Sequence, residues 1–167
     1  KGFRFAFTKG IRLAEPVYGD FGLRAFCDVD LVAHPRDGAG IEDALAGMGF
    51  KVEGAERGAE RGTERAARTE GGLAHSPHYR KGDLLIEVNY DALGLQIPLA
   101  APEEIWDGVG SVDLGGMALP VMSLEHELCH LCALVMQHSY VRLIWLTDIA
   151  EVSARPELDW GRVRAIC

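Results

Sequence analysis

The sequence predicts an α+β fold, with strands and helices alternating in the first part of the chain and helices dominating the rest. Up to about residue 90, apolar strand-like runs alternate with segments of helical spacing. Beyond residue 100 most apolar residues follow the helical repeat. The 167 residues, of which 48% are hydrophobic, suffice for one domain with a sizeable core.

Five elements are expected before residue 92. In chain order they are a strand at 3–10, a helix at 11–19, a strand at 24–34, a helix at 40–50 and a strand at 83–91. The first helix cannot extend far beyond Pro16, because proline lacks the backbone donor that a helix interior needs. Gly49 is the expected end of the second helix.

A charged, glycine-rich segment separates the second helix from the last of these strands. Residues 54–72, "GAERGAERGTERAARTEGG", lack apolar periodicity and alternate in charge. Such a composition is typical of a solvated loop or a frayed helix. We therefore divide the chain into a core at 1–100, with a flexible insert at 54–80, and a mainly helical part at 101–167.

The C-terminal part begins with a short helix at 101–109 and a hairpin at 111–123, turning at Gly115 and Gly116. Ser123 is the expected N-cap of a helix that runs to about His138. A second helix is expected at 140–154. A last helix is expected to begin at Pro156, since proline suits the first turn.

The charge balance limits the classes of partner. Seventeen Lys and Arg residues against 25 Asp and Glu residues give a net charge of −8. This balance argues against a broad nucleic-acid surface or binding to an anionic membrane. An acidic protein that handles a polyanionic substrate needs metal ions to bridge the two.

Targeting and redox features are sparse. Four irregularly spaced cysteines do not form a disulfide pattern, and the sequence has neither a signal peptide nor an 18-residue apolar span. We expect a reduced, cytoplasmic protein without a membrane span. The chain starts with Lys1 rather than Met, which leaves open a preceding N-terminal segment.

The pair Asp28 and Asp30, in "CDVDL", is the first candidate site. On a strand, residues two apart project from the same face, and two carboxylates so close repel each other unless cations lie between them. Paired oxygen ligands on a strand are typical of Mg²⁺ sites in phosphoryl transfer. Glu87 interrupts the apolar strand "LLIEV" and is costly to bury alone, so we expect it beside the pair. A chance DxD facing water is the alternative.

A family resemblance is carried by the runs "FTKGIRLAEPVYGDFGLRAFCDVDLVAHP", "IEDALAGMGFKV", "LLIEVNYD" and "SLEHELCHLCALVMQHSYVRLIWLTDIAEV". Over residues 5–155 the chain resembles the uncharacterised nucleotidyltransferase family of the polymerase-β-like superfamily. The resemblance implies a small mixed β-sheet backed by helices, with a helical C-terminal part packed beside it. It also implies transfer of a nucleoside monophosphate from an NTP, with ATP as the first candidate, to a hydroxyl of an unknown small-molecule or protein acceptor.

By this resemblance Asp28, Asp30 and Glu87 would be both the catalytic acids and the ligands of Mg²⁺ or Mn²⁺, with Glu87 orienting or deprotonating the attacking hydroxyl. Lys9 and Gly10 would lie at the triphosphate, where the wider superfamily has Gly-Ser or Gly-Gly. Arg24 would contact phosphate, although a solvated charge or a partner for a nearby aspartate is the alternative. The altered turn also leaves open a nucleotide-binding or regulatory protein with degenerate catalysis.

"HELCH" at 126–130 spells the zinc-protease motif HExxH. Helical spacing places His126 and His130 one turn apart, away from the apolar stripe, and Glu151 lies at the distance of a third ligand. The metzincin continuation is absent, because Ala133 and Met136 replace the required glycine and histidine. We rank a zinc hydrolase below the nucleotidyltransferase and expect Glu127 to be a surface charge.

Two histidines remain as candidate substrate contacts. His130 tends to recur in the family that the chain resembles. His78 lies in "HSPHYRKGD", ahead of the Glu87 strand, where a surface loop without a role is the alternative.

Overall fold

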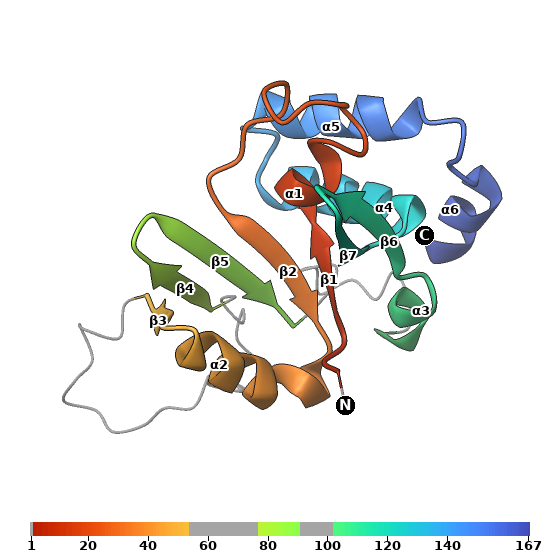
Figure 1. The fold of residues 1–167 in the computed structure, drawn as a ribbon. Coiled ribbons are helices and arrows are strands. Elements are labelled where there is room, and N and C mark those ends of the chain that lie inside the picture. Colours follow the sequence, from red (N-terminus) through yellow and green to blue (C-terminus); the bar gives the residue numbers. More distant parts are fainter. Residues whose placement is uncertain (1, 54–76, 91–101) are drawn as a thin grey trace.

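The computed structural model describes residues 2–53, 77–90 and 102–167 (Figure 1). Its strands are β1 (Phe5–Thr8), β2 (Val29–Ala33), β3 (Lys51–Val52), β4 (His78–Lys81), β5 (Leu84–Asn89), β6 (Gly110–Leu114) and β7 (Met117–Val121). Its helices are α1 (Lys9–Leu13), α2 (Gly38–Gly47), α3 (Pro102–Asp107), α4 (Leu124–Gln137), α5 (Leu143–Ser153) and α6 (Trp160–Ile166), with a 3-10 turn at Pro35–Asp37.

The seven strands form one mixed sheet in the order β3-β4-β5-β2-β1-β7-β6. β2 runs parallel to β5 and β1 runs parallel to β7, while the other neighbours are antiparallel. The hairpin β6–β7 therefore adds two strands from the C-terminal part to the sheet. The predicted α+β fold with a mixed sheet and helices is confirmed.

The two faces of the sheet are covered by different helices (Figure 1). On one face, Leu31, Ala33 and Val88 pack with Ile41 and Leu45 of α2. Side chains alternate between the faces along a strand, so Asp30 and Val32 point to the opposite face. This opposite face carries α1 and the C-terminal helices.

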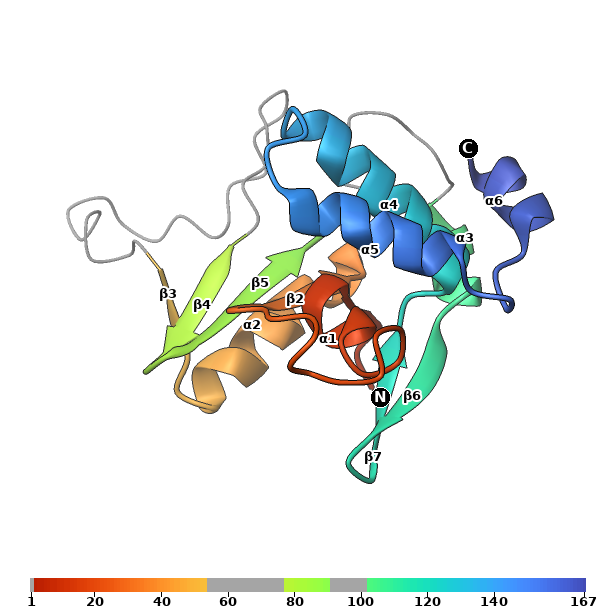
Figure 2. The same ribbon diagram turned by 90° about the horizontal axis from the view of Figure 1, so that it is seen from above.

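Helices α4, α5 and α6 share a core of their own with α1 and the turn that follows it. Leu13 and Val17 pack there with Leu131 of α4, Val152 of α5 and Val163 of α6. Figure 2 shows α5 lying along α4 on the side of the sheet that carries α1. The Ser123 side chain accepts a hydrogen bond from the backbone N–H of His126, which confirms the predicted cap of α4.

Three sequence expectations are wrong in detail. His78–Lys81 forms the strand β4, not part of a loop, because it pairs with β5; residues 54–76 of the expected insert lie outside the described residues. α1 already begins at Lys9. The last helix begins at Trp160, not Pro156, because Asp159 caps it by accepting from the backbone of Gly161 and Arg162.

Within these described ranges, the helices are too short or too polar to span a membrane.

Candidate active site

A row of polar side chains crosses four neighbouring strands on the face opposite α2. Thr8 of β1 is registered with Asp30 of β2, Asp30 with Glu87 of β5, and Glu87 with His78 of β4. Directly paired residues project from the same face of a sheet. The register therefore aligns two acids, a hydroxyl and an imidazole that are far apart in the sequence.

Asp28, Asp30 and Glu87 form an acidic cluster. Each offers a carboxylate oxygen, and these oxygens all lie within 4.8 Å of one another. In the part of the chain that the structure describes, this is the only such group of three His, Cys, Asp or Glu side chains. Carboxylate oxygens are hard ligands, so this donor set fits Mg²⁺ or Mn²⁺ and is a poor match for soft metals.

Lys9 supplies a positive charge inside the cluster. Its Nζ lies 2.7 Å from Asp30 Oδ1 and 3.8 Å from Glu87 Oε2. The side chains are only 14% exposed for Lys9, 5% for Asp30 and 21% for Glu87. One ammonium facing three carboxylates leaves an excess of negative charge.

The pKa values in the cluster reflect burial and these neighbours. Burial raises the pKa of Asp30 to about 7, against the opposing effect of Lys9 and with help from Glu87 and Asp28. Burial also opposes charge on Lys9 and Glu87. The attraction of Asp30 and Glu87 nevertheless raises the pKa of Lys9, and the attraction of Lys9 lowers the pKa of Glu87.

Glu127 anchors the turn that carries Lys9. Its Oε2 accepts from the Thr8 hydroxyl at 2.7 Å, and its Oε1 accepts from the Lys9 backbone N–H at 2.9 Å. Lys9 adopts a φ of +50° there, which is unusual for a residue other than glycine. The expectation that Glu127 is a surface charge is wrong, because the side chain is 0% exposed.

Gly10 is required by close packing of this turn. A Cβ at Gly10 would lie 2.5 Å from Cβ of Phe26, closer than any real contact. Glycine therefore lets the first turn of α1 approach the segment that leads to Asp28. Sequence reasoning assigned Gly10 to the triphosphate and missed this packing.

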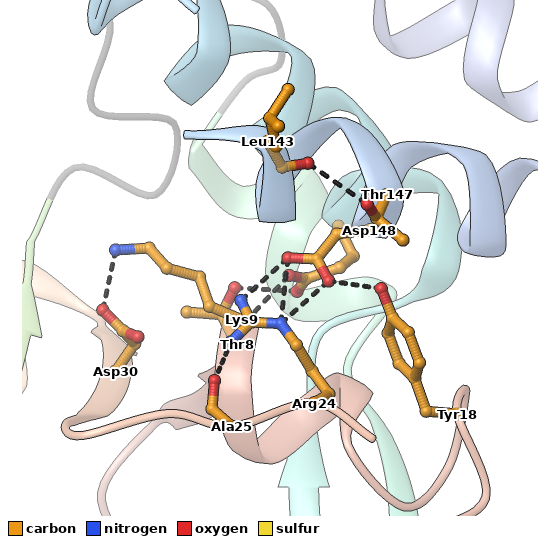
Figure 3. Close-up of polar contacts among 10 residues, drawn as sticks. Thr8, Lys9, Tyr18, Arg24, Ala25, Asp30, Leu143, Thr147 and Asp148 are labelled. Atoms are coloured by element: carbon orange, nitrogen blue, oxygen red, sulfur yellow. Dashed lines mark hydrogen bonds and ion pairs between the residues drawn. The ribbon is translucent and has the colours of Figure 1, made fainter. Parts of the chain in front are cut away.

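Arg24 is held by a buried aspartate of α5 (Figure 3). Its Nε and Nη2 donate to the Asp148 carboxylate at 2.8 Å, and Nη1 donates to the Ala25 carbonyl. Tyr18 donates its hydroxyl to the same carboxylate at 2.8 Å. Of the two interpretations of Arg24, the structure shows the ion pair with an aspartate, although this aspartate lies 124 residues away in the sequence.

The HExxH side chains lie in the interior and do not form a metal group in the described structure. The expectation that His126 and His130 lie off the core is wrong: they are 1% and 4% exposed, because α4 is covered on several sides. His126 Nδ1 hydrogen-bonds the Ser123 hydroxyl at 2.9 Å. Glu151 is exposed on α5, and Glu127 is committed to the turn of Lys9.

His78 lies at the rim of the acidic cluster. Its Nε2 is 3.9 Å from Glu87 Oε2, its Nδ1 is 3.8 Å from Glu53 Oε2, and its side chain is 45% exposed. The structure thus brings His78 to the cluster, whereas it buries His130 in α4. Substrate contact by either histidine stays a prediction.

The fold and the site define a chain with a mixed sheet and an acid cluster beside a strand–turn–helix. Its fold is similar to that of the antibiotic-resistance factor ANT(2″)-Ia, solved in solution, with a TM-score of 0.61 and 13% sequence identity. The likeness covers 98% of this chain and 80% of that one. No curated protein matches the chain in sequence.

A family model described as "Uncharacterised nucleotidyltransferase" matches residues 1–167. The chain belongs to this family of nucleotidyltransferases.

Proposed function

We propose that the protein is a metal-dependent nucleotidyltransferase that moves a nucleoside monophosphate from an NTP, with ATP as the first candidate, to a hydroxyl of a small molecule or protein. The observation that carries this proposal is the meeting of Asp28, Asp30 and Glu87 within 4.8 Å beside the Lys9 ammonium. Membership of the nucleotidyltransferase family supports the reaction class.

Asp28, Asp30 and Glu87 would hold Mg²⁺ or Mn²⁺. A divalent cation there supplies charge neutralisation at the phosphates and promotes ionisation of the acceptor hydroxyl. Asp30 and Glu87 are fixed by strand pairing, whereas Asp28 precedes β2. Two of the three proposed metal ligands are therefore held in the sheet, and the third lies just before a strand begins.

In the proposed reaction, the acceptor oxygen bonds to the α-phosphorus while the bond from that phosphorus to the bridging oxygen of pyrophosphate breaks. Glu87 takes up the proton of the acceptor hydroxyl, since its side chain is more exposed than that of Asp30 and its lowered pKa favours the ionised form that a base needs. We place the acceptor on the side of His78, whose half-exposed ring lies 3.9 Å from Glu87.

In this proposal Lys9 and Gly10 form the turn that binds the triphosphate. The Lys9 ammonium lies at the end of β1, where it can reach phosphate oxygens that enter the acidic cluster. Arg24 contributes indirectly, by fixing the segment before Asp28 through its pair with Asp148. We propose it as a positioning residue.

A nucleotide-binding or regulatory protein without catalysis is the second candidate. The Lys9–Asp30 ion pair favours it, because it places a protein cation among the metal ligands. Both candidates require nucleotide binding, but only an enzyme transfers the nucleotide.

The test combines binding and turnover. Calorimetry with ATP should show binding that depends on Mg²⁺, and incubation with ATP, Mg²⁺ and a panel of hydroxyl-bearing acceptors, the protein itself included, should release pyrophosphate. Asp28→Asn should lower the release by about a hundredfold or more. Asp43→Asn, which changes an exposed acid on α2, is the matched control and should leave it unchanged.

Mg²⁺-dependent binding without pyrophosphate release would favour the regulatory candidate. Nucleotide binding that ignores both Mg²⁺ and Asp28→Asn would contradict the proposed metal site.

A further inference from the structure

The Lys9 ammonium contacts two of the three carboxylates that would hold a cation in the acidic cluster. It is 2.7 Å from Asp30 Oδ1 and 3.8 Å from Glu87 Oε2, and both residues belong to the three-carboxylate group. An ammonium and a divalent cation that share these carboxylates repel each other strongly, because the site is only slightly exposed to water. The cluster in this state already contains its own counter-ion.

The backbone of Lys9 is held by a hydrogen bond to a buried carboxylate, while its side chain is held only at its end, by the ion pair with Asp30. The backbone N–H is bound to Glu127 Oε1 at 2.9 Å, and Glu127 is completely buried. A lysine side chain, in contrast, has four carbons and several rotatable bonds. Release of the ammonium from Asp30 therefore requires only rotation of the side chain and no movement of the turn.

The phosphates of a nucleotide offer the displaced ammonium a new partner. They carry several negative charges and would enter the site together with the metal ion. Binding of metal and of nucleotide is then coupled through one side chain, which loses its partner when the metal enters and gains one when the triphosphate enters.

We propose that Lys9 is an internal competitor for the metal site, which holds Asp30 in the absence of substrate and moves to the triphosphate when metal and nucleotide bind together. This inference rests on the proposed function and adds its regulation: the cluster binds a divalent cation weakly alone and tightly with nucleotide. The Lys9–Asp30 ion pair would thus keep metal ions out of the acidic cluster until the nucleotide is present.

The experiment measures Mn²⁺ affinity of the full chain without nucleotide, by calorimetry and by the electron paramagnetic resonance signal of free Mn²⁺. Lys9→Met removes the ammonium and keeps the length of the side chain. Lys9→Gly removes it too and suits the φ of +50°, so it keeps the test valid if Lys9→Met does not fold. Both variants should bind Mn²⁺ about tenfold more tightly than the wild type, since a competing charge is gone.

The matched control is Lys51→Met, which removes one positive charge from an exposed position on β3. It should leave Mn²⁺ affinity within about twofold of the wild type, because separated surface charges are screened by salt. In a second arm, a non-hydrolysable ATP analogue should raise Mn²⁺ affinity more in the wild type than in Lys9→Met or Lys9→Gly.

Equal or weaker Mn²⁺ binding by both Lys9 variants would overturn the inference. The proposed metal site would still stand in that case if Asp28→Asn abolished the Mn²⁺ binding of the wild type. An absence of Mn²⁺ binding in the wild type and in both Lys9 variants, with and without the nucleotide analogue, would overturn both the inference and the proposed function.

Discussion

Glu127 shows how a single buried carboxylate sets the geometry of the site. It binds the Thr8 hydroxyl and the Lys9 backbone, the two residues at the junction of β1 and α1. Burial raises the pKa of Glu127, although Thr8, Arg12 and Lys9 each favour the ionised form. The carboxylate therefore orders the turn at an electrostatic cost.

This cost predicts a pH-dependent effect of Glu127→Gln. The pKa of Glu127 in the folded state lies above the unfolded value of about 4.3. The unfolded chain therefore loses the proton at a lower pH than the folded protein does. As the pH rises between these two pKa values, the contribution of Glu127 to the free energy of unfolding falls. Gln keeps an acceptor for Lys9 and escapes this loss. In urea titrations, the free energy of unfolding of Glu127→Gln relative to the wild type should be higher at pH 7 than at pH 4.

Two further variants complete this measurement. Glu15→Gln, at an exposed position, controls for the loss of one charge. Glu127→Ala leaves the Thr8 hydroxyl and the Lys9 N–H without their acceptor and should cost roughly 2–4 kcal/mol. A Gln-to-wild-type difference that does not change with pH would argue against a raised pKa.

At the residue scale, the sequence predicted the acids but not the anchor. Asp28, Asp30 and Glu87 can be predicted from the sequence, because carboxylates among apolar strand residues are costly to bury without a partner. Glu127 is missed by sequence analysis, because His126 and His130 complete a metal motif around it and the glutamate itself is interpreted as a surface charge. Only the burial of α4 on more than one side shows its role.

At the element scale, α5 is tied to the loop between α1 and β2 by a buried ion pair. Asp148 is 0% exposed and receives both Arg24 and the Tyr18 hydroxyl. Tyr18 and Arg24 both lie in the segment between α1 and β2, ahead of Asp28. The pair therefore positions one end of the acidic cluster relative to the C-terminal helices.

Removing Asp148 should be strongly destabilising. Asp148→Ala leaves the Arg24 guanidinium buried without its carboxylate, which is expected to cost about 3–5 kcal/mol. Glu53→Ala is the control, because it breaks the exposed Arg80–Glu53 pair and should cost less than about 1 kcal/mol. Thermal unfolding followed by circular dichroism measures the loss of stability in both variants. Similar losses would show that the buried pair stabilises the protein no more than the exposed one.

The sequence predicted β5, α4 and the hairpin β6–β7, but it missed β3 and β4. β5 and α4 have clear periodicity, and Ser123 marks the start of α4. β3 has two residues and β4 reads "HYRK", so neither contains an apolar alternation to detect. β4 pairs with β5 as a hairpin that turns at Gly82 and Asp83, a local turn signal that the sequence analysis did not use, whereas β3 pairs with β4 over a long separation in the sequence.

At the scale of the whole molecule, the sheet separates a structural face from a chemical face. α2 covers one face with apolar contacts, while Thr8, Asp30, Glu87 and His78 form a polar row on the other. The parallel pairing of β2 with β5 brings Asp30 beside Glu87 across 57 residues of sequence. The family resemblance implied this meeting, whereas spacing within the sequence could not establish the register.

The central claim is that the acidic cluster of Asp28, Asp30 and Glu87 holds the metal and that the neighbouring turn of Lys9 holds the nucleotide. A crystal structure of the protein with Mg²⁺ and a non-hydrolysable ATP analogue tests it most directly. The account predicts a cation about 2.1 Å from oxygens of Asp28 and Asp30, with Glu87 beside it and the triphosphate at the turn of Lys9. A nucleotide bound away from these residues, or a metal bound by His126 and His130 instead, would contradict it.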